Sequence, residues 1–474
     1  MSTIIEEKHT SLNHSHNAPE INLLTLNSGP HDTSPDIVGL QECWTQDDYL
    51  AIREATADIL PHGKFYFAGA FGGGLAILSR WPIESSSMFR YPLNGRPTAF
   101  WRGDWYVGKG VACASVRFGP ARKDVIEVFN THTHAPYESG PNDSYICHRT
   151  AQAWEISKLI NAATDRGHLV VALGDFNMLP RSFAHRIITG RSGVRDVWRT
   201  LHPDSSLGPA DHPDEVDRGL PVPTADFNLL VNGATSDGVY NTWRWTKNAQ
   251  NALRAGNPCP VDPNTPDPRG KRLDYIFAST GFSGPFTPSS VPRHGWVVKS
   301  ASVAMTQRHP ELNVSLSDHF AVLATLKYHT VSDSSPTPAG GSAITAVEHD
   351  ENSPDPDIQF LRDTSGDSMP LSTAVFDEIL AMILKYTTRE VKQQYWRGIR
   401  FYTSLAIWVG CLVAVWFSPR NFVAFILMLV SSLCLTAGVI EGLLALLFFS
   451  AELRALKEFE WEIRTARSFA SDEN

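Results

Sequence analysis

The chain lacks any run of lysine or arginine residues, and its net charge is −9. Proteins that bind duplex nucleic acid normally present a basic stripe that neutralises phosphates, so we expect no nucleic-acid partner. Only six cysteines occur in 474 residues and none forms a CxxC pair, which argues against a disulfide framework and against a zinc site. The N-terminal stretch has no long apolar core, so the sequence predicts no secretory signal.

The length allows one large domain and additional segments. Residues 19–330 alternate short apolar strands with helical stretches and are expected to form one catalytic α/β domain. Within it, residues 203–270 are rich in Pro, Asp and Gly and predict a long irregular excursion. Residues 1–18 and 331–372 are polar and offer little to bury, so we expect a disordered tail and a disordered linker.

Two long apolar runs stand near the C-terminus. Residues 401–417 carry no charge, and residues 422–449 carry only Glu441. At a rise of ~1.5 Å per residue the second run exceeds the roughly 30 Å hydrocarbon core of a bilayer. We expect residues 401–449 to form a transmembrane hairpin, with a buried helical pair as the alternative. Glu441 is costly in a membrane unless it faces the partner helix or lies near the interface.

Basic residues flank one side of the expected hairpin. They are Lys385, Arg389, Lys392, Arg397 and Arg400, whereas the turn carries only Arg420. By the positive-inside rule the catalytic domain and both termini face the cytoplasm, in the endoplasmic reticulum, the mitochondrial outer membrane or the plasma membrane. We expect residues 373–400 to be a basic amphipathic juxtamembrane segment that binds anionic phospholipids. Residues 450–474 are expected to be a cytoplasmic tail.

Polar side chains end several of the expected strands. They are Asn27, Glu42, His132, His134, Asp175 and Asn177, while Asp318 and His319 precede a strand. Strand tips of an α/β sheet meet at one rim. Hard oxygen ligands suit Mg²⁺, or Mn²⁺ in its place, and histidines suit proton transfer near neutral pH. Each motif alone is more often a cap or a surface group; the combination is the specific signal.

Four short motifs carry a resemblance to a known superfamily: LQE ending at Glu42, GDFN at 174–177, LDYIF at 273–277 and SDH at 317–319. They are similar to those of the endonuclease/exonuclease/phosphatase superfamily, which implies a four-layered α/β sandwich of two packed mixed β-sheets flanked by helices. Within it, the stretches DIVGLQECW, GGGLAILSRWPI, WYVGKGVA, NTHTHAPY and GDFNMLP resemble the neutral sphingomyelinases and inositol phosphosphingolipid phospholipases C. A two-helix C-terminal anchor belongs to that branch as well.

The resemblance assigns roles to the metal ligands and the base. Glu42 is implied as the main Mg²⁺ ligand, with Asn27 beside it and Asp318 as a further ligand. His319 is implied as the general base that takes a proton from the attacking water. Asp274 is implied to hold the His319 imidazole in the right tautomer.

The remaining site residues are implied to act on the phosphate and the water. Asp175 is expected to position the water and the base. Asn177 and His132 are expected to hydrogen-bond the phosphoryl oxygens as charge builds on them; His132 matches the family position better than His134. The resemblance implies a Mg-dependent phosphodiesterase of phospholipase C type that hydrolyses phosphosphingolipids to ceramide and a phosphorylated headgroup. A metal-dependent nuclease of the same superfamily and an inactive membrane-tethered member are the alternatives. The headgroup and the oligomeric state stay open.

The run GDWYVGKG, residues 103–110, nearly matches a nucleotide P-loop, but Gly110 stands where Ser or Thr is needed and a strand is expected next. The resemblance suggests instead that Lys109 contacts a substrate phosphate or an anionic lipid, with Asp104 nearby. A solvated lysine in a hairpin loop is the alternative. Aromatic residues gather among arginines around this run and predict a surface that enters the headgroup layer, with core packing of some rings as the alternative. They are Phe89, Tyr91, Phe100, Trp101, Trp105 and Tyr106.

One connection departs from the family pattern. Only eight residues, SGPHDTSP, separate Asn27 from the strand that ends near Glu42. A parallel crossover with a helix needs about a dozen residues or more. We therefore expect either that the two strands pair differently, or that a helix is missing and one sheet face is uncovered, so that Asn27 does not reach Glu42.

Overall fold

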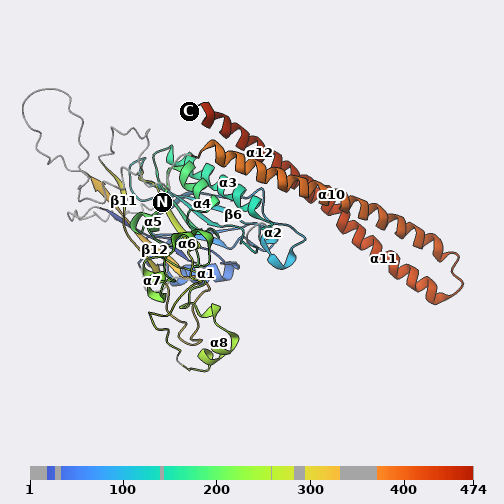
Figure 1. Ribbon diagram of the computed structural model, residues 1–474, viewed down its shortest axis with the longest axis horizontal. Coiled ribbons are helices and arrows are strands. Elements are labelled where there is room, and N and C mark those ends of the chain that lie inside the picture. The colour runs from blue at the N-terminus through green and yellow to red at the C-terminus, as the bar shows by residue number, and fades with distance from the viewer. Residues whose placement is uncertain are drawn as a thin grey trace, which may run out of the picture.

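The computed structural model of the protein describes residues 19–26, 34–138, 143–257, 259–281, 294–330 and 371–472. Its strands are β1 (Glu20–Leu26), β2 (Ile37–Leu40), β3 (His62–Tyr66), β4 (Leu75–Ser79), β5 (Ile83–Arg90), β6 (Gly110–Arg117), β7 (Val125–His132), β8 (Leu169–Asp175), β9 (Arg195–Asp196), β10 (Asp274–Ala278), β11 (His294–Ala304) and β12 (Ala321–Thr330). They form two six-stranded sheets, ordered β11-β12-β1-β2-β4-β3 and β5-β6-β7-β8-β10-β9 (Figure 1). Both sheets are mixed, because β1–β2 and β7–β8 pair in parallel and their other neighbours pair antiparallel.

The helices lie on the outer faces of the sheets and at the C-terminus. They are α1 (Gln46–Ala55), α2 (Asp104–Val107), α3 (Ile146–Thr164), α4 (Phe183–Ser192), α5 (Val197–Leu201), α6 (Pro213–Arg218), α7 (Ala225–Leu230), α8 (Lys247–Arg254), α10 (Thr373–Val415), α11 (Asn421–Leu443) and α12 (Phe449–Asp472), with 3-10 turns η1 (Phe100–Arg102) and η3 (Thr242–Arg244) and a π-helical turn η5 (Leu444–Phe448). The excursion over 203–270 holds only short helices, as expected.

The main core lies between the two sheets. Apolar residues from the inner faces of both sheets fill it, among them Leu23, Ile77, Val128, Leu173 and Val322. The sheets pack closely at Gly39 of β2, where an added Cβ would lie 1.8 Å from Leu173 Cδ1. Replacing a core leucine such as Leu173 by Ala typically costs about 2–5 kcal/mol, because the site cannot collapse fully around the cavity.

Helices cover the outer faces of both sheets. On the first sheet, Val38 and Leu40 share a core with Tyr49 of α1. On the second sheet, Phe277 packs with Trp154 of α3 and Ile187 of α4. The order helix, sheet, sheet, helix confirms the predicted four-layered α/β sandwich.

The strands on either side of the short connection pair as neighbours. β1 and β2 run parallel, with Leu23 opposite Ile37 and Leu26 opposite Leu40. The expectation that these strands pair differently is therefore wrong. Leu24 and Leu26 are at most 1% exposed, so the expectation of an uncovered face at these positions is also wrong. The connection itself lies largely outside the described residues, as does Asn27.

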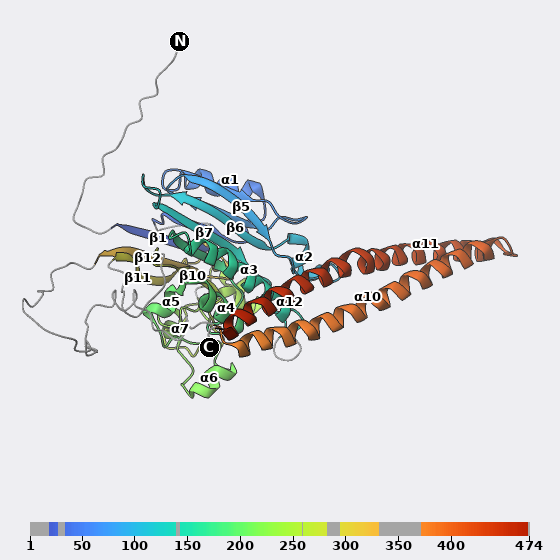
Figure 2. The same cartoon turned by 90° about the horizontal axis from the view of Figure 1, so that it is seen from above.

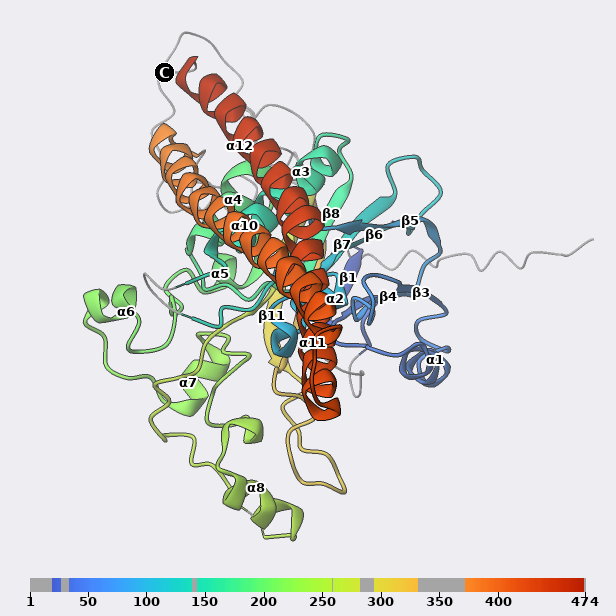
Figure 3. The same cartoon turned by 90° about the vertical axis from the view of Figure 1, so that its right-hand side faces the viewer.

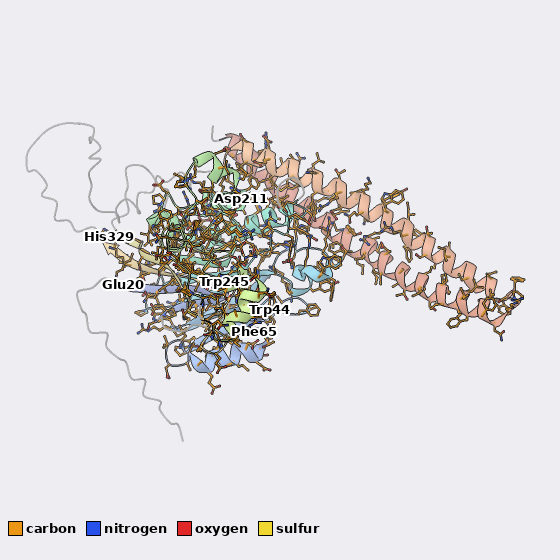
Figure 4. All side chains as sticks on the ribbon, turned by 60° about the horizontal axis from the view of Figure 1, so that its bottom comes forward. Glu20, Trp44, Phe65, Asp211, Trp245 and His329 are labelled. Atoms are coloured by element: carbon orange, nitrogen blue, oxygen red, sulfur yellow. The ribbon has the colours of Figure 1, made fainter. Side chains whose placement is uncertain are left out.

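The two apolar helices α10 and α11 form a hairpin that extends away from the sheets (Figures 1 and 2). Both are long and apolar enough to cross a membrane, and Figure 4 shows their side chains standing outward from the ribbon. The helices approach closely because Gly438 and Gly442 face Ser404 and Phe401, the small-residue packing common in membranes. Glu441 pairs with arginines of α10, 2.8 Å from Arg397 Nη1 and 3.6 Å from Arg400 Nη1. It faces the partner helix, which is one of the two arrangements that the sequence allowed.

The first half of α10 and all of α12 fold back over α3 (Figure 3). Phe376 and Ile379 of α10 and Phe459 and Ile463 of α12 belong to the same core as Trp154 of α3. The amphipathic segment 373–400 therefore turns its apolar face to the catalytic domain, and residues 450–472 form a packed helix. The sequence pattern predicts a lipid-facing segment and a tail at these places and does not reveal this extra helical layer.

Candidate active site

Strand ends from both sheets meet at one rim. In the second sheet the register places His132 of β7 and Asp274 of β10 on either side of Asp175 at the end of β8. The sheets are linked at the same end, because Gln41 Nε2 after β2 donates to Asn130 Oδ1 of β7 over 2.6 Å. The predicted convergence of strand tips thus arises from the parallel pairs β1–β2 and β7–β8 facing each other across the core.

Three buried side chains form the centre of the rim. One potential metal-ligand atom from each of Asp175, Asp274 and His319 lies within 4.8 Å of the other two. His319 Nδ1 lies 2.9 Å from Asp274 Oδ2 and 4.0 Å from Asp175 Oδ2. His132 adds a second imidazole, with Nε2 3.3 Å from Asp175 Oδ2. The structure therefore brings together four of the residues that the sequence singled out.

Burial and mutual charge shift the pKa values of this group. Burial, together with the Asp274 carboxylate, raises the pKa of Asp175 to about 7, although His319 acts in the opposite direction. Burial lowers the pKa of His319, but Asp274 and Asp175 outweigh it and raise that pKa to about 10. Burial, with Lys109 nearby, holds the pKa of His132 well below its usual range, so His132 is neutral. The carboxylates of Asp175 and Asp274 therefore both face the same positively charged imidazole, that of His319.

This group has the chemistry of a divalent-cation site. Asp274 Oδ1 is buried and has no hydrogen-bond partner among the described residues, and buried polar atoms are seldom left so. Carboxylate oxygens are the ligands that Mg²⁺ prefers. A bound cation would complete the coordination of Asp274 Oδ1 and would lower the pKa of His319, because positive charge disfavours the imidazolium. The residues present therefore fit a metal ion.

Glu42 and Asp318, two of the metal ligands expected from the sequence, lie at the surface. Glu42 follows β2, is exposed, and has a φ of 56°, in the left-handed region that glutamate rarely adopts. Asp318 is exposed and precedes β12. Neither belongs to the buried group of Asp175, Asp274 and His319, and Asn27 lies outside the described residues. Their metal role stays a prediction.

Asn177 is tied to Asp175 rather than left open. Its backbone N–H donates to Asp175 Oδ1 over 2.8 Å, and its side-chain Nδ2 donates to Asp175 Oδ2 over 3.1 Å and to the Thr133 carbonyl over 3.2 Å. Both amide hydrogens are used inside the protein. In this arrangement Asn177 positions the Asp175 carboxylate, and donation to a phosphoryl oxygen would require it to give up one of these bonds.

Lys109 lies behind Asn177 in a buried ion pair. It is 5% exposed, and its Nζ lies 3.0 Å from Asp104 Oδ1 and donates to the Thr133 carbonyl over 2.8 Å. Burial raises the pKa of Asp104, but Lys109 and then His134 outweigh it and hold that pKa below its usual range. His134 lies beside this ion pair, with Nε2 3.6 Å from Asp104 Oδ2. The alternative of a solvated lysine is therefore wrong. The Thr133 carbonyl accepts from both Lys109 and Asn177 and so links them.

The strand β6 begins at Gly110. A nucleotide P-loop would open a helix here, so the run 103–110 is not a P-loop.

A cavity of about 530 Å³ opens beside the buried group. Asn177, Asp318 and His319 line it, together with residues that the sequence analysis did not single out: Ser236, Asp237, Trp243, Arg244 and Lys271. Only Lys271 had a readable signal, since it stands three residues before Asp274. The others belong to the excursion 203–270, where no periodicity marks the residues that face a site.

The aromatic cluster around η1 and α2 divides between surface and core. Phe100, Trp101 and Trp105 are exposed, Trp101 by 83%, whereas Tyr91 is buried. The Trp105 ring lies 6.2 Å from that of Phe448 in η5, so this cluster stands beside the base of the apolar hairpin.

Two mixed sheets with acids and imidazoles gathered at one rim fit a metal-dependent hydrolase of phosphate esters. The model of the endonuclease/exonuclease/phosphatase family matches residues 16–319. The inositol phosphosphingolipids phospholipase C of Schizosaccharomyces pombe is 36% identical over 430 residues, covering 90% of this chain and 85% of that protein. The protein of the same name from Saccharomyces cerevisiae is 30% identical over 434 residues, covering 91% and 78%. Sphingomyelin phosphodiesterase 2 of Rattus norvegicus is 27% identical over 311 residues, covering 65% and 60%. This chain belongs to the endonuclease/exonuclease/phosphatase family, in the branch of the sphingomyelinases and inositol phosphosphingolipid phospholipases C, and is a phosphoric diester hydrolase.

Proposed function

We propose that the protein hydrolyses phosphosphingolipids to ceramide and a phosphorylated headgroup, with Mg²⁺ or Mn²⁺ as its cofactor. The observation that carries this proposal is the buried group of Asp175, Asp274 and His319, which adjoins a cavity in a chain that also has two membrane-length apolar helices. The names of the two yeast relatives support the substrate class.

The residues at the rim account for a proton transfer from the attacking water to His319. Because Asp274 engages His319 Nδ1, Nε2 is the nitrogen left to accept a proton. Water attacks phosphorus, its proton passes to His319, and the bond between phosphorus and the ceramide oxygen breaks. That oxygen takes up a proton from solvent and His319 returns its proton to solvent, so charge and atoms balance. Glu42, with Asn27 and Asp318 as expected ligands and the buried carboxylates of Asp175 and Asp274, would hold a divalent cation, which would supply positive charge to the phosphate.

The other rim residues hold this arrangement in place. Neutral His132 lies against Asp175 and offers the phosphate a hydrogen bond without adding charge. Asn177 orients the Asp175 carboxylate, and the buried ion pair of Lys109 and Asp104 supports Asn177 through the Thr133 carbonyl. Lys109 therefore acts on the phosphate through other residues, as a positioning group, rather than as a lipid contact at the surface.

The membrane arrangement follows from the hairpin and its flanking charges. We propose that α10 and α11 cross the bilayer with both ends and the catalytic domain in the cytoplasm. The exposed rings of Phe100, Trp101 and Trp105 beside the hairpin base then enter the headgroup layer, and anionic phospholipids there are the expected activators. Subcellular fractionation would show which of the three expected membranes contains the protein.

Two alternatives compete with this function. A nuclease of the same family would use the same acids and imidazoles, but the acidic net charge and the apolar hairpin favour a lipid substrate. An inactive tethered member is disfavoured because β1 and β2 pair normally despite their short connection.

A single assay separates these functions. Full-length protein in mixed micelles is given radiolabelled inositol phosphoceramide, sphingomyelin or an abasic-site duplex, with Mg²⁺ or with chelator, beside His319→Ala. We expect release of phosphorylated headgroup with Mg²⁺ only, and none from His319→Ala. Cleavage of the duplex alone would establish a nuclease. No turnover of any substrate would establish an inactive member. Equal turnover in chelator would contradict the role of the metal.

A further inference from the structure

One wall of the active-site cavity carries a fixed pair of cations around a carboxylate. Lys271 Nζ lies 2.8 Å from Asp237 Oδ2, and Arg244 Nη2 pairs with Asp237 Oδ1. All three residues line the cavity together with His319. We call Asp237, Arg244 and Lys271 the basic wall. The catalytic steps above use none of them.

The basic wall is joined rigidly to the catalytic histidine. The backbone of Ser236, directly before Asp237, bridges both Lys271 and His319. Two backbone hydrogen bonds of 3.0 Å connect Ser236 and Lys271. Asp237 itself has a φ of 65°, an uncommon conformation for a non-glycine residue that recurs at functional sites.

The turn that carries Arg244 is fastened to the segment before His319. Asn241 Nδ2 donates to the Ser317 carbonyl over 3.1 Å, and Trp243 Nε1 donates to the Ser315 carbonyl over 2.9 Å. The wall thus keeps a set distance from the base, which is what a binding group needs in order to orient one part of a substrate while another part reacts.

The charge of the wall suits one kind of headgroup. Two cations surround one carboxylate, so the wall is net positive, and its side chains together offer several N–H donors and carboxylate acceptors. A hydroxyl-rich, uncharged ring can use these donors and acceptors. A quaternary ammonium has no hydrogen-bonding atoms and is repelled by the two cations, although Trp243 lies beside them and Asp318 is also in the cavity.

We propose that Asp237, Arg244 and Lys271 select the headgroup, favouring an inositol-type polyol over choline on the leaving phosphate. This inference rests on the proposed function and assigns residues to its specificity.

The test compares two lipids in the same micelles. Full-length protein, Arg244→Gln and Lys271→Gln are assayed with inositol phosphoceramide and with sphingomyelin at equal mole fraction, and kcat and KM are determined separately. The matched control is Arg254→Gln, an exposed arginine of α8 in the same excursion that does not line the cavity. Inhibition by myo-inositol 1-phosphate and by phosphocholine gives a second readout. It can be measured even for a variant that retains only a trace of activity.

We expect the unaltered protein to prefer inositol phosphoceramide in kcat/KM by more than tenfold. Each wall variant should lower that preference about tenfold, mainly through KM, and should weaken inhibition by myo-inositol 1-phosphate, while Arg254→Gln keeps the preference. An equal loss for both lipids, or an unchanged preference, would overturn the role of the wall and leave the proposed function standing. Failure of the unaltered protein to cleave either lipid would instead overturn the proposed function.

Discussion

Two buried polar clusters in this protein resemble each other in composition and differ in charge balance. The catalytic cluster holds Asp175, Asp274 and His319. The second cluster, which we call the docking cluster, lies where α10 and α12 meet the catalytic domain and holds Arg96, His148, Tyr386, Arg389, Glu390 and Glu452. Each contains two buried carboxylates and a buried histidine.

The two clusters differ in what balances their carboxylates. In the docking cluster Arg96 and Arg389 pair with Glu390, and Glu452 accepts from the Tyr386 hydroxyl over 3.0 Å. Two arginines thus accompany two carboxylates. In the described part of the catalytic cluster, His319 is the cation that lies against both carboxylates, and Lys109 acts on Asp175 from farther away. The comparison teaches that a deficit of positive charge, rather than the presence of buried acids, marks the site that needs a cation.

The largest expected effect separates the two histidines. His319→Gln should lower kcat by about 10³-fold, within the range of a lost general base, and it also removes a buried partner of Asp274. His148→Gln, the matched change in the docking cluster, should lower the melting temperature and keep most of kcat. Steady-state assays and thermal unfolding of the detergent-solubilised protein measure both. Comparable kcat losses for the two variants would erase the distinction.

The next largest effect concerns the buried pair that holds the helices to the domain. Arg96→Met leaves Glu390, which is fully buried, with one cation fewer. Breaking a buried pair typically costs about 3–5 kcal/mol, and we expect the lower end because Arg389 remains. The matched control is Arg467→Met, which breaks the exposed pair with Asp377 between α12 and α10 and should leave the urea midpoint unchanged. Equal shifts for both variants would mean that burial of the pair is irrelevant.

A third, charge-balanced pair behind the catalytic cluster predicts a pH dependence of stability. Asp196 accepts from Arg272 over 2.9 and 2.8 Å. Burial raises the pKa of Asp196, but Arg272 and His185 outweigh it and hold that pKa below its usual range. A carboxyl with a lowered folded-state pKa stabilises fully above its unfolded pKa of about 3.9, and the stabilisation is lost as pH falls through the folded value.

Asp196→Asn should therefore destabilise the protein by about 2–3 kcal/mol at pH 7. Its stability should also fall less than that of the unaltered protein between pH 4 and pH 2. Urea unfolding at several pH values measures the difference. If the free energies of unfolding of the two proteins changed in parallel with pH, the ion pair of Asp196 would not be the source of the pH dependence.

The smallest effect belongs to the ion pair that supports Asn177. Lys109→Met removes the donor to the Thr133 carbonyl and should lower kcat about 10–100-fold, as changes in groups that orient active-site residues do. Because Lys109 is buried, salt should not change the size of this loss. A variant with full kcat but weaker vesicle binding would show that Lys109 is a lipid contact instead.

The fold was predictable because the motifs LQE, GDFN, LDYIF and SDH resemble those of a known superfamily, and the rim because its residues stand beside strand ends. Asp175, Asp274 and His319 stand at strand ends, and β-sheet register brings such ends together. The sequence was insufficient for Phe376 and Ile379, since an amphipathic helix has the same pattern whether its apolar face meets lipid or protein. Arg244 was missed because loop residues carry no periodicity. One alternative wrongly placed Lys109 in solvent. Its burial depends on contacts with Asp104 and Thr133 that are set by tertiary packing and have no local sequence signal.

We expect a divalent cation to offset the deficit of positive charge at Asp175, Asp274 and His319. The most direct measurement is the melting temperature of the metal-free protein as Mg²⁺ is added, for the unaltered chain and for Asp274→Asn and Glu42→Gln. Binding at 100 times Kd should stabilise the unaltered protein by about 2.7 kcal/mol. We predict that Asp274→Asn abolishes this shift and that Glu42→Gln reduces it. An unaltered protein that does not respond to Mg²⁺, or an Asp274→Asn variant that responds equally, would contradict the account.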